Sequence, residues 1–375
     1  MSSSTFQESK VPVVFITGAT GTQGLNLATL LRSPAINWTV RTTVRDPTSA
    51  AALRLASLGV NLTPGSWDDI PALTAGLQTC THLFLNTIPS FTDPLLERRQ
   101  TSQILSLAKS AGVKHVIFSS ALGINHLSEM PLFTSTPGIK DSVMYHSLLS
   151  KAATEETVKS SGFQYWTILR GASFMENYLT PKVYMYGPEF VTKRIWKMAC
   201  SPDDTLPLVD TVDIAKFALA AFRQPERFNG QEVSIAGDVL PIRDIAAKIT
   251  RAVRNIEDAW ESKAEAAQLA ASTSGGGGTS ASFFSAENLP GPIVGSGSWR
   301  IELKGKHIQY IPMTEEEIEG AKKTKNPYVL GQLAIREIGK FVSVEETKAW
   351  GVEVSTFEEF LEREVEAVRT TYCRA

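Results

Sequence analysis

The sequence predicts an α/β protein: a doubly wound parallel sheet of the Rossmann type, followed by a smaller, mixed C-terminal region. Short apolar runs alternate with segments of helical periodicity through the first 170 residues. A turn that contains three glycines joins the first apolar run to the first helical segment. Beyond Arg170 the alternation loosens, so the strand–helix units that produce a parallel sheet covered by helices lie in the N-terminal half.

The individual elements follow from the spacing of apolar residues. Residues 13–17 form a short apolar run, which is typical of a strand buried on both faces, and residues 38–44 alternate and are rich in β-formers. Strands are expected at residues 13–17, 38–44, 83–85, 116–119 and 165–169, and helices at residues 25–31, 50–58, 101–111, 150–160, 209–222 and 242–270. Two further helices are expected near the C-terminus.

Composition divides the chain into segments. Residues 272–298 contain four consecutive glycines, many serines and two prolines, and such a stretch buries too little apolar surface to offset its ordering entropy. The expected segments are a disordered tail at 1–10, a dinucleotide-binding domain at 11–170, and a mixed substrate or lid region at 171–375 with a flexible insertion at about 272–298.

Charge and cysteine content exclude several classes of function. The net charge of −2 gives no reason to expect nucleic acid or an anionic membrane as a partner, because both require clustered positive charge. Three cysteines, widely separated, suggest neither a disulfide framework nor a metal site. No secretory start and no apolar stretch of membrane-spanning length is present. We therefore expect a cytoplasmic protein that acts on a small molecule.

The most informative feature is the glycine turn, residues 18–24, which has the spacing GxxGxxG. A tight strand-to-helix turn needs a residue without a Cβ, the approach of a pyrophosphate needs a second, and packing of the helix onto the strand needs a third. The start of the helix offers free N–H groups and the positive end of its dipole to the phosphates. The predicted pyrophosphate site is Gly18, Ala19, Thr20, Gly21, Thr22, Gln23 and Gly24. The alternative is a turn that binds no ligand.

The end of the second strand selects between dinucleotides. An acidic residue there binds the ribose hydroxyls of NAD, whereas an arginine accommodates the 2′-phosphate of NADP. Arg45 lies 21 residues after Gly24 and comes first at the strand end, which favours NADP(H) over NAD(H). In the alternative, Asp46 binds the ribose and Arg45 is a solvated charge. Asp46 before Pro47 is also typical of a helix cap, which weakens that alternative.

Four stretches together resemble the NmrA-like family of atypical short-chain dehydrogenase/reductases. They are GATGTQG at 18–24, TVRDP at 43–47, SGFQYWTILRGASFMENYL at 161–179 and KGKHIQYIPMTEEE at 304–317. The family includes NADP-sensing regulators and NAD(P)H-dependent quinone and aldehyde reductases. The resemblance spans residues 11–320 without the insertion, and it implies a Rossmann fold that binds NADP(H).

The resemblance also implies roles for individual residues. Ser66 and Trp67 would lie beside the adenine, with Ser66 in place of the usual aspartate. Residues that would line the path to the nicotinamide ribose, or flank the nicotinamide itself, are Thr87, Ile88, Pro89, Arg99, Lys151, Phe174, Met175, Glu176 and Asn177.

The residue pattern around Lys151 differs from that of ordinary short-chain dehydrogenases, which carry a tyrosine four residues before a lysine on one helix face. Here that position is Ser147, while Tyr145 faces elsewhere on a regular helix. Lys151 therefore has three interpretations. It positions the nicotinamide ribose, it donates a proton with a pKa lowered by burial, or it is a solvated helix lysine. It is our only candidate catalytic residue.

Weaker candidates surround the predicted substrate side. Ser119 and Ser120 end the fifth strand, where they contact substrate or cap the loop. His146 is a proton relay or a structural histidine. The aromatic residues Phe174, Tyr178, Tyr184 and Tyr186 either wall a substrate pocket or belong to the core.

Two hypotheses of different classes follow. The first is an NADPH-dependent reductase of a small conjugated, carbonyl or iminium-type substrate, since the cofactor carries the hydride chemistry and the protein mainly positions it. The second is a non-catalytic redox sensor that binds NADP(H) and acts through a protein partner, in the cytoplasm or the nucleus. An epimerase or dehydratase with tightly held cofactor is less favoured without the usual tyrosine.

Overall fold

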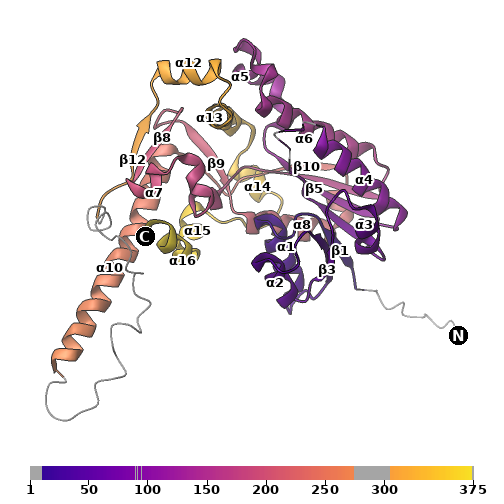
Figure 1. The fold of residues 1–375 in the computed structure, drawn as a ribbon, viewed down its shortest axis with the longest axis horizontal. Coiled ribbons are helices and arrows are strands. Elements are labelled where there is room, and N and C mark those ends of the chain that lie inside the picture. Colours follow the sequence, from indigo (N-terminus) through magenta and orange to yellow (C-terminus); the bar gives the residue numbers. More distant parts are fainter. Residues whose placement is uncertain (1–10, 89, 91, 94, 274–304, 374–375) are drawn as a thin grey trace.

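The computed structural model describes residues 11–373 except positions 89, 91, 94 and 274–304 (Figure 1). The predicted tail at 1–10 and most of the predicted insertion at 272–298 therefore lie outside the described residues. Seven parallel strands form one sheet in the order β10-β6-β5-β4-β1-β2-β3. They are β1 (Val13–Ile16), β2 (Thr39–Val44), β3 (Asn61–Pro64), β4 (His82–Leu85), β5 (His115–Ala121), β6 (Tyr165–Gly171) and β10 (Gln231–Ile235). The predicted doubly wound sheet is confirmed.

Helices cover both faces of this sheet. One face carries α1 (Thr22–Arg32), α2 (Ala50–Ser57) and α8 (Thr211–Arg223), and the other carries α3 (Ile70–Leu77), α4 (Leu96–Ser110) and α6 (Val143–Ser160). Successive strand residues serve opposite faces: Val14 and Ile16 pack with the first set of helices, and Phe15 packs with the second. All three side chains are fully buried, as the apolar run predicts.

The C-terminal region builds a smaller, mixed structure, seen at the left of Figure 1. Strands β7 (Ser173–Phe174), β9 (Thr205–Val209) and β11 (Asp238–Pro241) form a sheet in which β9 pairs parallel to β7 and antiparallel to β11. Strand β8 (Ile195–Met198) pairs with β12 (Gln309–Pro312). An aromatic core around Trp196 and Phe190 fills this region. This aromatic core supports the segment of the chain that follows β7.

The remaining elements of the described residues are short, apart from α10. The helices are α5 (Pro131–Ser135), α7 (Glu189–Thr192), α9 (Pro225–Phe228), α10 (Ile242–Thr273), α12 (Glu315–Lys323), α13 (Pro327–Ile338), α14 (Val344–Lys348), α15 (Phe357–Arg363) and α16 (Val365–Val368). The 3₁₀ helices are η1 (Ile124–Glu129), η2 (Ile139–Asp141), η3 (Met175–Tyr178), η4 (Lys182–Tyr186) and η5 (Gly339–Phe341), and the π-helix is η6 (Arg369–Cys373).

The structure differs from the sequence prediction at several elements. The helix predicted at 150–160 begins at Val143, because the Ser142 hydroxyl caps it by accepting from the Tyr145 N–H. Strand β3 and helix α3 were not predicted. Five helices, α12 to α16, follow β12 where two were expected. Strand β10 joins the large sheet although it lies beyond residue 170, so the sheet extends past the proposed domain boundary.

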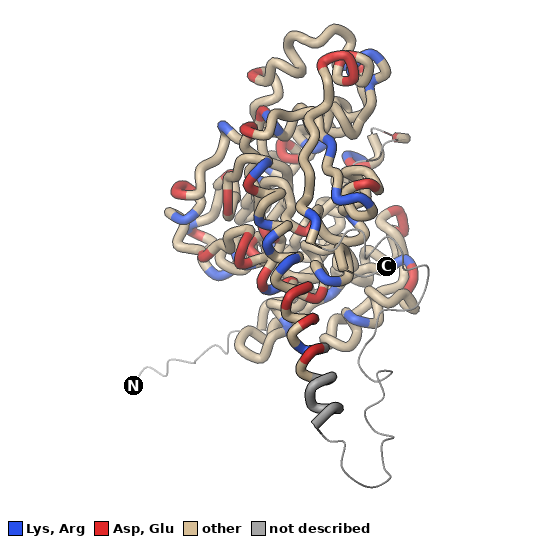
Figure 2. Tube along the Cα trace, turned by 90° about the vertical axis from the view of Figure 1, so that its left-hand side faces the viewer, with Lys and Arg blue, Asp and Glu red and all other residues tan. Residues whose placement is uncertain are grey.

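Charged residues of both signs are interspersed over the face shown in Figure 2. Ion pairs in the described part of the chain include Lys197 with Glu317 and Lys248 with Glu358. Helices in the described part of the chain lack the combination of length and apolar character that a membrane span requires.

Candidate functional site

The glycine turn lies between β1 and α1, where the strand order of the sheet reverses direction. Gly18 has φ +63°, a left-handed conformation that favours glycine, and a Cβ there would lie 3.2 Å from the Asn86 carbonyl oxygen. A Cβ on Gly24 would lie 2.5 Å from the Gly18 oxygen and 2.6 Å from the Ala19 Cα. Two of the three glycines are therefore required by the fold itself.

Gly21 has a different role, because it leaves the start of α1 open. It is the N-cap residue, and as a glycine it has no side chain that could cap the helix. A Cβ on Gly21 would meet one neighbour, the Gly18 oxygen at 3.3 Å, so the space beside it is accessible. Among the described residues no acceptor satisfies the N–H groups of Thr22, Gln23 or Gly24. Unpaired N–H groups and the positive end of the helix dipole fit an anionic group such as a pyrophosphate.

Neighbouring strand ends approach this turn. The Ser119 hydroxyl donates to Gln23 Oε1 over 2.6 Å, so the end of β5 contacts the turn directly. The Trp67 ring lies 3.8 Å from the position that a Gly18 Cβ would take. The Ser66 hydroxyl accepts from the Asp68 N–H at 3.2 Å and so shapes its own turn. The structure therefore brings Ser119 and Trp67 to the glycine turn.

Arg45 follows β2 at the same edge of the sheet. It is exposed and makes no hydrogen bond or ion pair with any described residue. The Asp46 carboxylate, in contrast, accepts from the Thr48 N–H at 2.8 Å and from its hydroxyl at 2.6 Å. These hydrogen bonds hold the pKa of Asp46 below its usual value. Asp46 is not the helix cap: the Ser49 side chain caps α2 by accepting from the Ala52 N–H.

Lys151 lies at the ends of β4 and β5 in a largely buried position. Its Nζ is 3.1 Å from Glu97 Oε1, donates to the Thr87 carbonyl at 3.2 Å, and lies 5.0 Å from the centre of the Phe118 ring. The Thr87 hydroxyl also donates to Glu97, at 2.9 Å. With 12% of its side chain exposed, Lys151 is not the solvated lysine of the third interpretation. Ile88 is 70% exposed next to this group, and Pro89 lies outside the described residues.

The residues before Lys151 do not place a tyrosine hydroxyl beside it, as ordinary short-chain dehydrogenases do. The Ser147 hydroxyl donates to the Val143 carbonyl of its own helix. Tyr145 packs on Phe133, with ring centres 5.2 Å apart. His146 is exposed. The tyrosine–lysine pair of ordinary short-chain dehydrogenases is thus absent from α6 in space as well as in sequence.

Three predicted ligand contacts are side chains that the structure buries in the protein interior, and these predictions are corrected. The Ser120 hydroxyl donates to Glu155 at 2.5 Å, and Glu155 in turn pairs with Arg170 inside the protein. Tyr178 is fully buried in the aromatic core, as is Met175. Met175 and Tyr178 fill core space because the segment after β7 packs into the C-terminal aromatic cluster, whereas Ser120 is buried by its bond to Glu155. Arg99 pairs with Asp93 at the surface, at 2.6 Å.

The segment that follows β7 reaches back to the glycine turn. Glu176 accepts from the Thr211 N–H at 3.2 Å and from the Thr211 hydroxyl at the start of α8, where Asp210 is the N-cap residue. Burial raises the pKa of Glu176. Lys182 Nζ donates to the Thr22 hydroxyl at 2.8 Å and lies 5.7 Å from the centre of the Phe174 ring. Asn177 is half-buried beside Tyr178.

Lys182 and Glu97 are residues that sequence reasoning missed. Lys182 is 160 positions from Thr22, and no motif surrounds it. Glu97 carried a readable signal, since an isolated acidic residue on the buried side of an amphipathic helix requires a positive partner.

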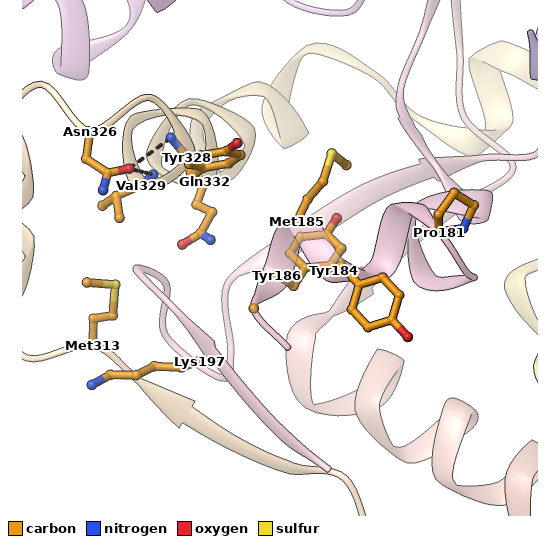
Figure 3. A pocket seen from close by; sticks show the side chains of 11 residues that line it. Pro181, Tyr184, Met185, Tyr186, Lys197, Met313, Asn326, Tyr328, Val329 and Gln332 are labelled. Atoms are coloured by element: carbon orange, nitrogen blue, oxygen red, sulfur yellow. Dashed lines mark hydrogen bonds between the residues drawn. The ribbon is translucent and has the colours of Figure 1, made fainter. Parts of the chain in front are cut away.

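A pocket of about 620 Å³ opens in the C-terminal region (Figure 3). Tyr184, Met185 and Tyr186 come from η4, and Tyr328 comes from α13 on the opposite side. The remaining lining residues are Pro181, Gly187, Lys197, Met313, Asn326, Val329 and Gln332. Three tyrosines and two methionines are among the eleven lining residues, and Tyr184 and Tyr186 are pocket residues while Tyr178 belongs to the core.

Further candidates for reactive groups are the cysteines Cys80 and Cys200 and the side chains that could bind a metal ion. Burial raises the pKa values of Cys80 and Cys200 to about 12, so neither thiol is activated as a nucleophile. Within the described ranges, histidine, cysteine and carboxylate side chains do not gather in groups of three that could hold a metal ion.

Comparison with known proteins agrees with this fold. The family model described as "NmrA-like family" matches residues 10–257. The NmrA-like family domain-containing oxidoreductase ptmS of Penicillium ochrochloron is 31% identical over 174 residues, which cover 44% of this chain and 48% of that protein. The match thus spans about half the length of this relative.

Two solved structures share the fold. The NADPH-dependent quinone oxidoreductase QOR2 of Escherichia coli, complexed with NADPH, superposes with a TM-score of 0.59 at 20% identity, covering 93% of this chain and 99% of that one. NmrA, a negative transcriptional regulator, in complex with NADP, gives a TM-score of 0.61 at 17% identity and covers 96% and 97% of the two chains. Because the family model covers most of the chain, including the glycine turn, the protein belongs to the NmrA-like family.

Proposed function

We propose that the protein is an NADPH-dependent reductase of a small conjugated, carbonyl or iminium-type organic substrate. The observation that carries this proposal is the open glycine turn: the N–H groups of Thr22, Gln23 and Gly24 have no acceptor among the described residues, and the space beside Gly21 is open. A dinucleotide bound there would supply the hydride. The chain's own contribution is to bind and orient that cofactor and its acceptor.

The preference for NADPH rests on the end of β2. Arg45 is exposed and unpaired among the described residues, so its guanidinium is available to a 2′-phosphate. The Asp46 carboxylate already accepts two hydrogen bonds from Thr48, which reduces its capacity to bind ribose hydroxyls. Both observations favour NADPH over NADH.

Lys151 serves this reaction as a positioning residue. Its ammonium holds the Thr87 carbonyl and the Glu97 carboxylate, and so fixes the loop that leaves β4 toward the predicted nicotinamide end. A conjugated or iminium acceptor takes hydride without a strong protein acid, which agrees with the missing tyrosine. The pocket walled by Tyr184 and Met185 suits a flat, apolar organic molecule.

The test is loss of NADPH absorbance with a panel of quinones, aldehydes, enones and iminium compounds. The matched control is Gly21→Leu, which places a side chain beside the helix start and whose Cβ would meet one backbone atom, the Gly18 oxygen at 3.3 Å; thermal unfolding checks that the variant folds. We expect turnover by the wild type with at least one substrate class and none by the variant. No turnover with any class would overturn the proposal.

One observation favours a second candidate, a non-catalytic NADP(H)-binding sensor that acts through a protein partner. Ser147 occupies the position of the usual catalytic tyrosine, and its hydroxyl is tied to the Val143 carbonyl. Calorimetry separates the two candidates. A sensor binds oxidised and reduced cofactor with very different affinities, whereas a reductase releases NADP⁺ at each turnover.

A further inference from the structure

We propose that Lys182, which comes from the C-terminal region, binds the pyrophosphate of a dinucleotide held at the glycine turn. The inference rests on the proposed function and adds a contact that the glycine motif does not contain. Lys182 begins η4, immediately after Pro181, and its Nζ donates to the Thr22 hydroxyl over 2.8 Å. Thr22 is the first residue of α1, so the ammonium lies at the mouth of the predicted phosphate site.

The electrostatics of this position are unbalanced without an anion. A positive charge at the start of a helix is repelled by the positive end of the helix dipole. Among the described residues, the hydrogen bond that Lys182 makes goes to a neutral hydroxyl. Burial lowers the pKa of Lys182, and the nearby Glu176 charge opposes that effect. The protein thus places a partly buried cation where its own dipole disfavours one.

Glu176 lies near Lys182, but among the described residues its carboxylate forms no hydrogen bond or ion pair with the ammonium. One oxygen accepts from the Thr211 N–H and hydroxyl at the start of α8. The other oxygen is buried and has no hydrogen-bond partner among the described residues. Asn26 also donates to the Thr211 hydroxyl, at 2.8 Å, so this group holds α1 and α8 together. A pyrophosphate between Lys182 and the first N–H groups of α1 would supply the missing negative charge.

The Phe174 ring contacts the ammonium group of Lys182. Its ammonium lies over the Phe174 ring, with 5.7 Å between Nζ and the ring centre. Phe174 ends β7, which is paired with β9, so the ring has a rigid base. The lysine stem is therefore held against the C-terminal region while its charged end points at the glycine turn. This is the arrangement expected of a residue that reaches across to a ligand.

The experiment measures ligand affinity by calorimetry for the wild type, Lys182→Met and Lys182→Arg. The matched control is Lys193→Met, which removes an exposed lysine that pairs with Glu189 on the surface. The ligands are NADPH, 2′-phospho-ADP-ribose, which keeps the pyrophosphate, and 2′-AMP, which lacks it. Thermal unfolding of each variant checks that the fold is kept.

We expect Lys182→Met to weaken both pyrophosphate ligands by about tenfold to a hundredfold, the usual range for a hydrogen bond to a charged group, while the affinity for 2′-AMP stays unchanged. Lys182→Arg should retain most of the affinity, and Lys193→Met all of it. Equal binding by Lys182→Met and the wild type, or equal loss for all three ligands, would overturn the inference alone. No binding of NADPH or NADH by the wild type would overturn the proposed function and this inference together.

Discussion

Lys151 Nζ lies 3.1 Å from Glu97 Oε1, and the Glu97 side chain is entirely shielded from solvent. The pair joins α6 to the start of α4 and, through the Thr87 hydroxyl, to the loop after β4. A buried carboxylate needs a cation beside it, because a buried charge without a partner lowers the free energy of unfolding by several kcal/mol.

The first prediction concerns this pair. Lys151→Met should lower the free energy of unfolding by about 3 kcal/mol or more, since it leaves Glu97 buried without a counter-charge. The double variant Lys151→Met/Glu97→Met should recover most of that loss. Urea denaturation measures both. Lys193→Met, which removes an exposed surface pair, serves as control and should change stability little. Additive losses in the double variant would contradict the buried-pair explanation.

The second prediction concerns the last glycine of the turn. In Gly24→Ala the added Cβ would lie 2.5 Å from the Gly18 oxygen, and backbone atoms there cannot move without opening the turn. We expect loss of NADPH binding together with a lower Tm. Gly331→Ala is the control: Gly331 lies inside α13 with open space around its Cβ position, so the change should stabilise by about 0.5 kcal/mol or more. A Gly24→Ala protein that binds NADPH normally would contradict the packing argument.

The fold was predictable because the central strands β1, β4 and β5 are buried on both faces. The short apolar runs around Phe15, Phe84 and Phe118 are typical of buried strands. The glycine turn shows that the first of these strands is followed directly by a helix. Strand β3 escaped prediction because it alternates weakly and its residues are only partly buried. The number of C-terminal helices was underestimated for a different reason. They are short, and their signals are capping residues, such as Thr314 and Thr356 with a glutamate three positions later.

The site was predictable only in part, since motifs report local geometry. The glycine turn and Arg45 each follow a strand. Their relative positions are determined by the pairing of the two neighbouring strands β1 and β2. The Lys182–Thr22 and Lys151–Glu97 contacts join residues that are 160 and 54 positions apart, so they depend on how helices and loops pack. Tyr178 is the opposite case. It lies in the stretch 161–179 that resembles the family, yet its side chain packs in the core and not at the site.

The third prediction concerns acid stability. Burial lowers the pKa of His115 to about 3 and that of His82 to about 4, from an ordinary value of 6.5. The unfolded chain therefore binds more protons than the folded chain below pH 6.5, so the free energy of unfolding should fall as the pH drops from 6.5 toward 4. His115 contributes up to about 1.4 kcal/mol per pH unit in that range.

His115→Leu removes this contribution and should flatten the pH dependence, as urea denaturation between pH 4.5 and 7.5 would show. Both ring nitrogens of His115 are buried without hydrogen-bond partners among the described residues, so the substitution loses no hydrogen bond. His146→Gln is the control, because His146 is exposed and its loss should leave the slope unchanged. An unaltered slope in His115→Leu would show that His115 binds protons equally in the folded and the unfolded chain, which would contradict the prediction.

The fourth prediction tests how the protein selects its cofactor. Arg45 is exposed at the end of β2 and has no partner among the described residues, so its charge is free to meet a 2′-phosphate. Arg45→Glu should weaken NADPH binding by about a hundredfold or more, because it replaces an attraction with a repulsion, and should change NADH binding little. Arg54→Glu makes the same change of charge on the exposed side of α2 and controls for long-range effects. Fluorescence titration of both cofactors at 0.15 M salt, where the Debye length is about 8 Å, separates a direct contact from a diffuse field. If Arg45→Glu lost the same factor for NADH as for NADPH, the arginine would act on the fold or on the shared part of the dinucleotide, and the assignment of the 2′-phosphate to it would be wrong.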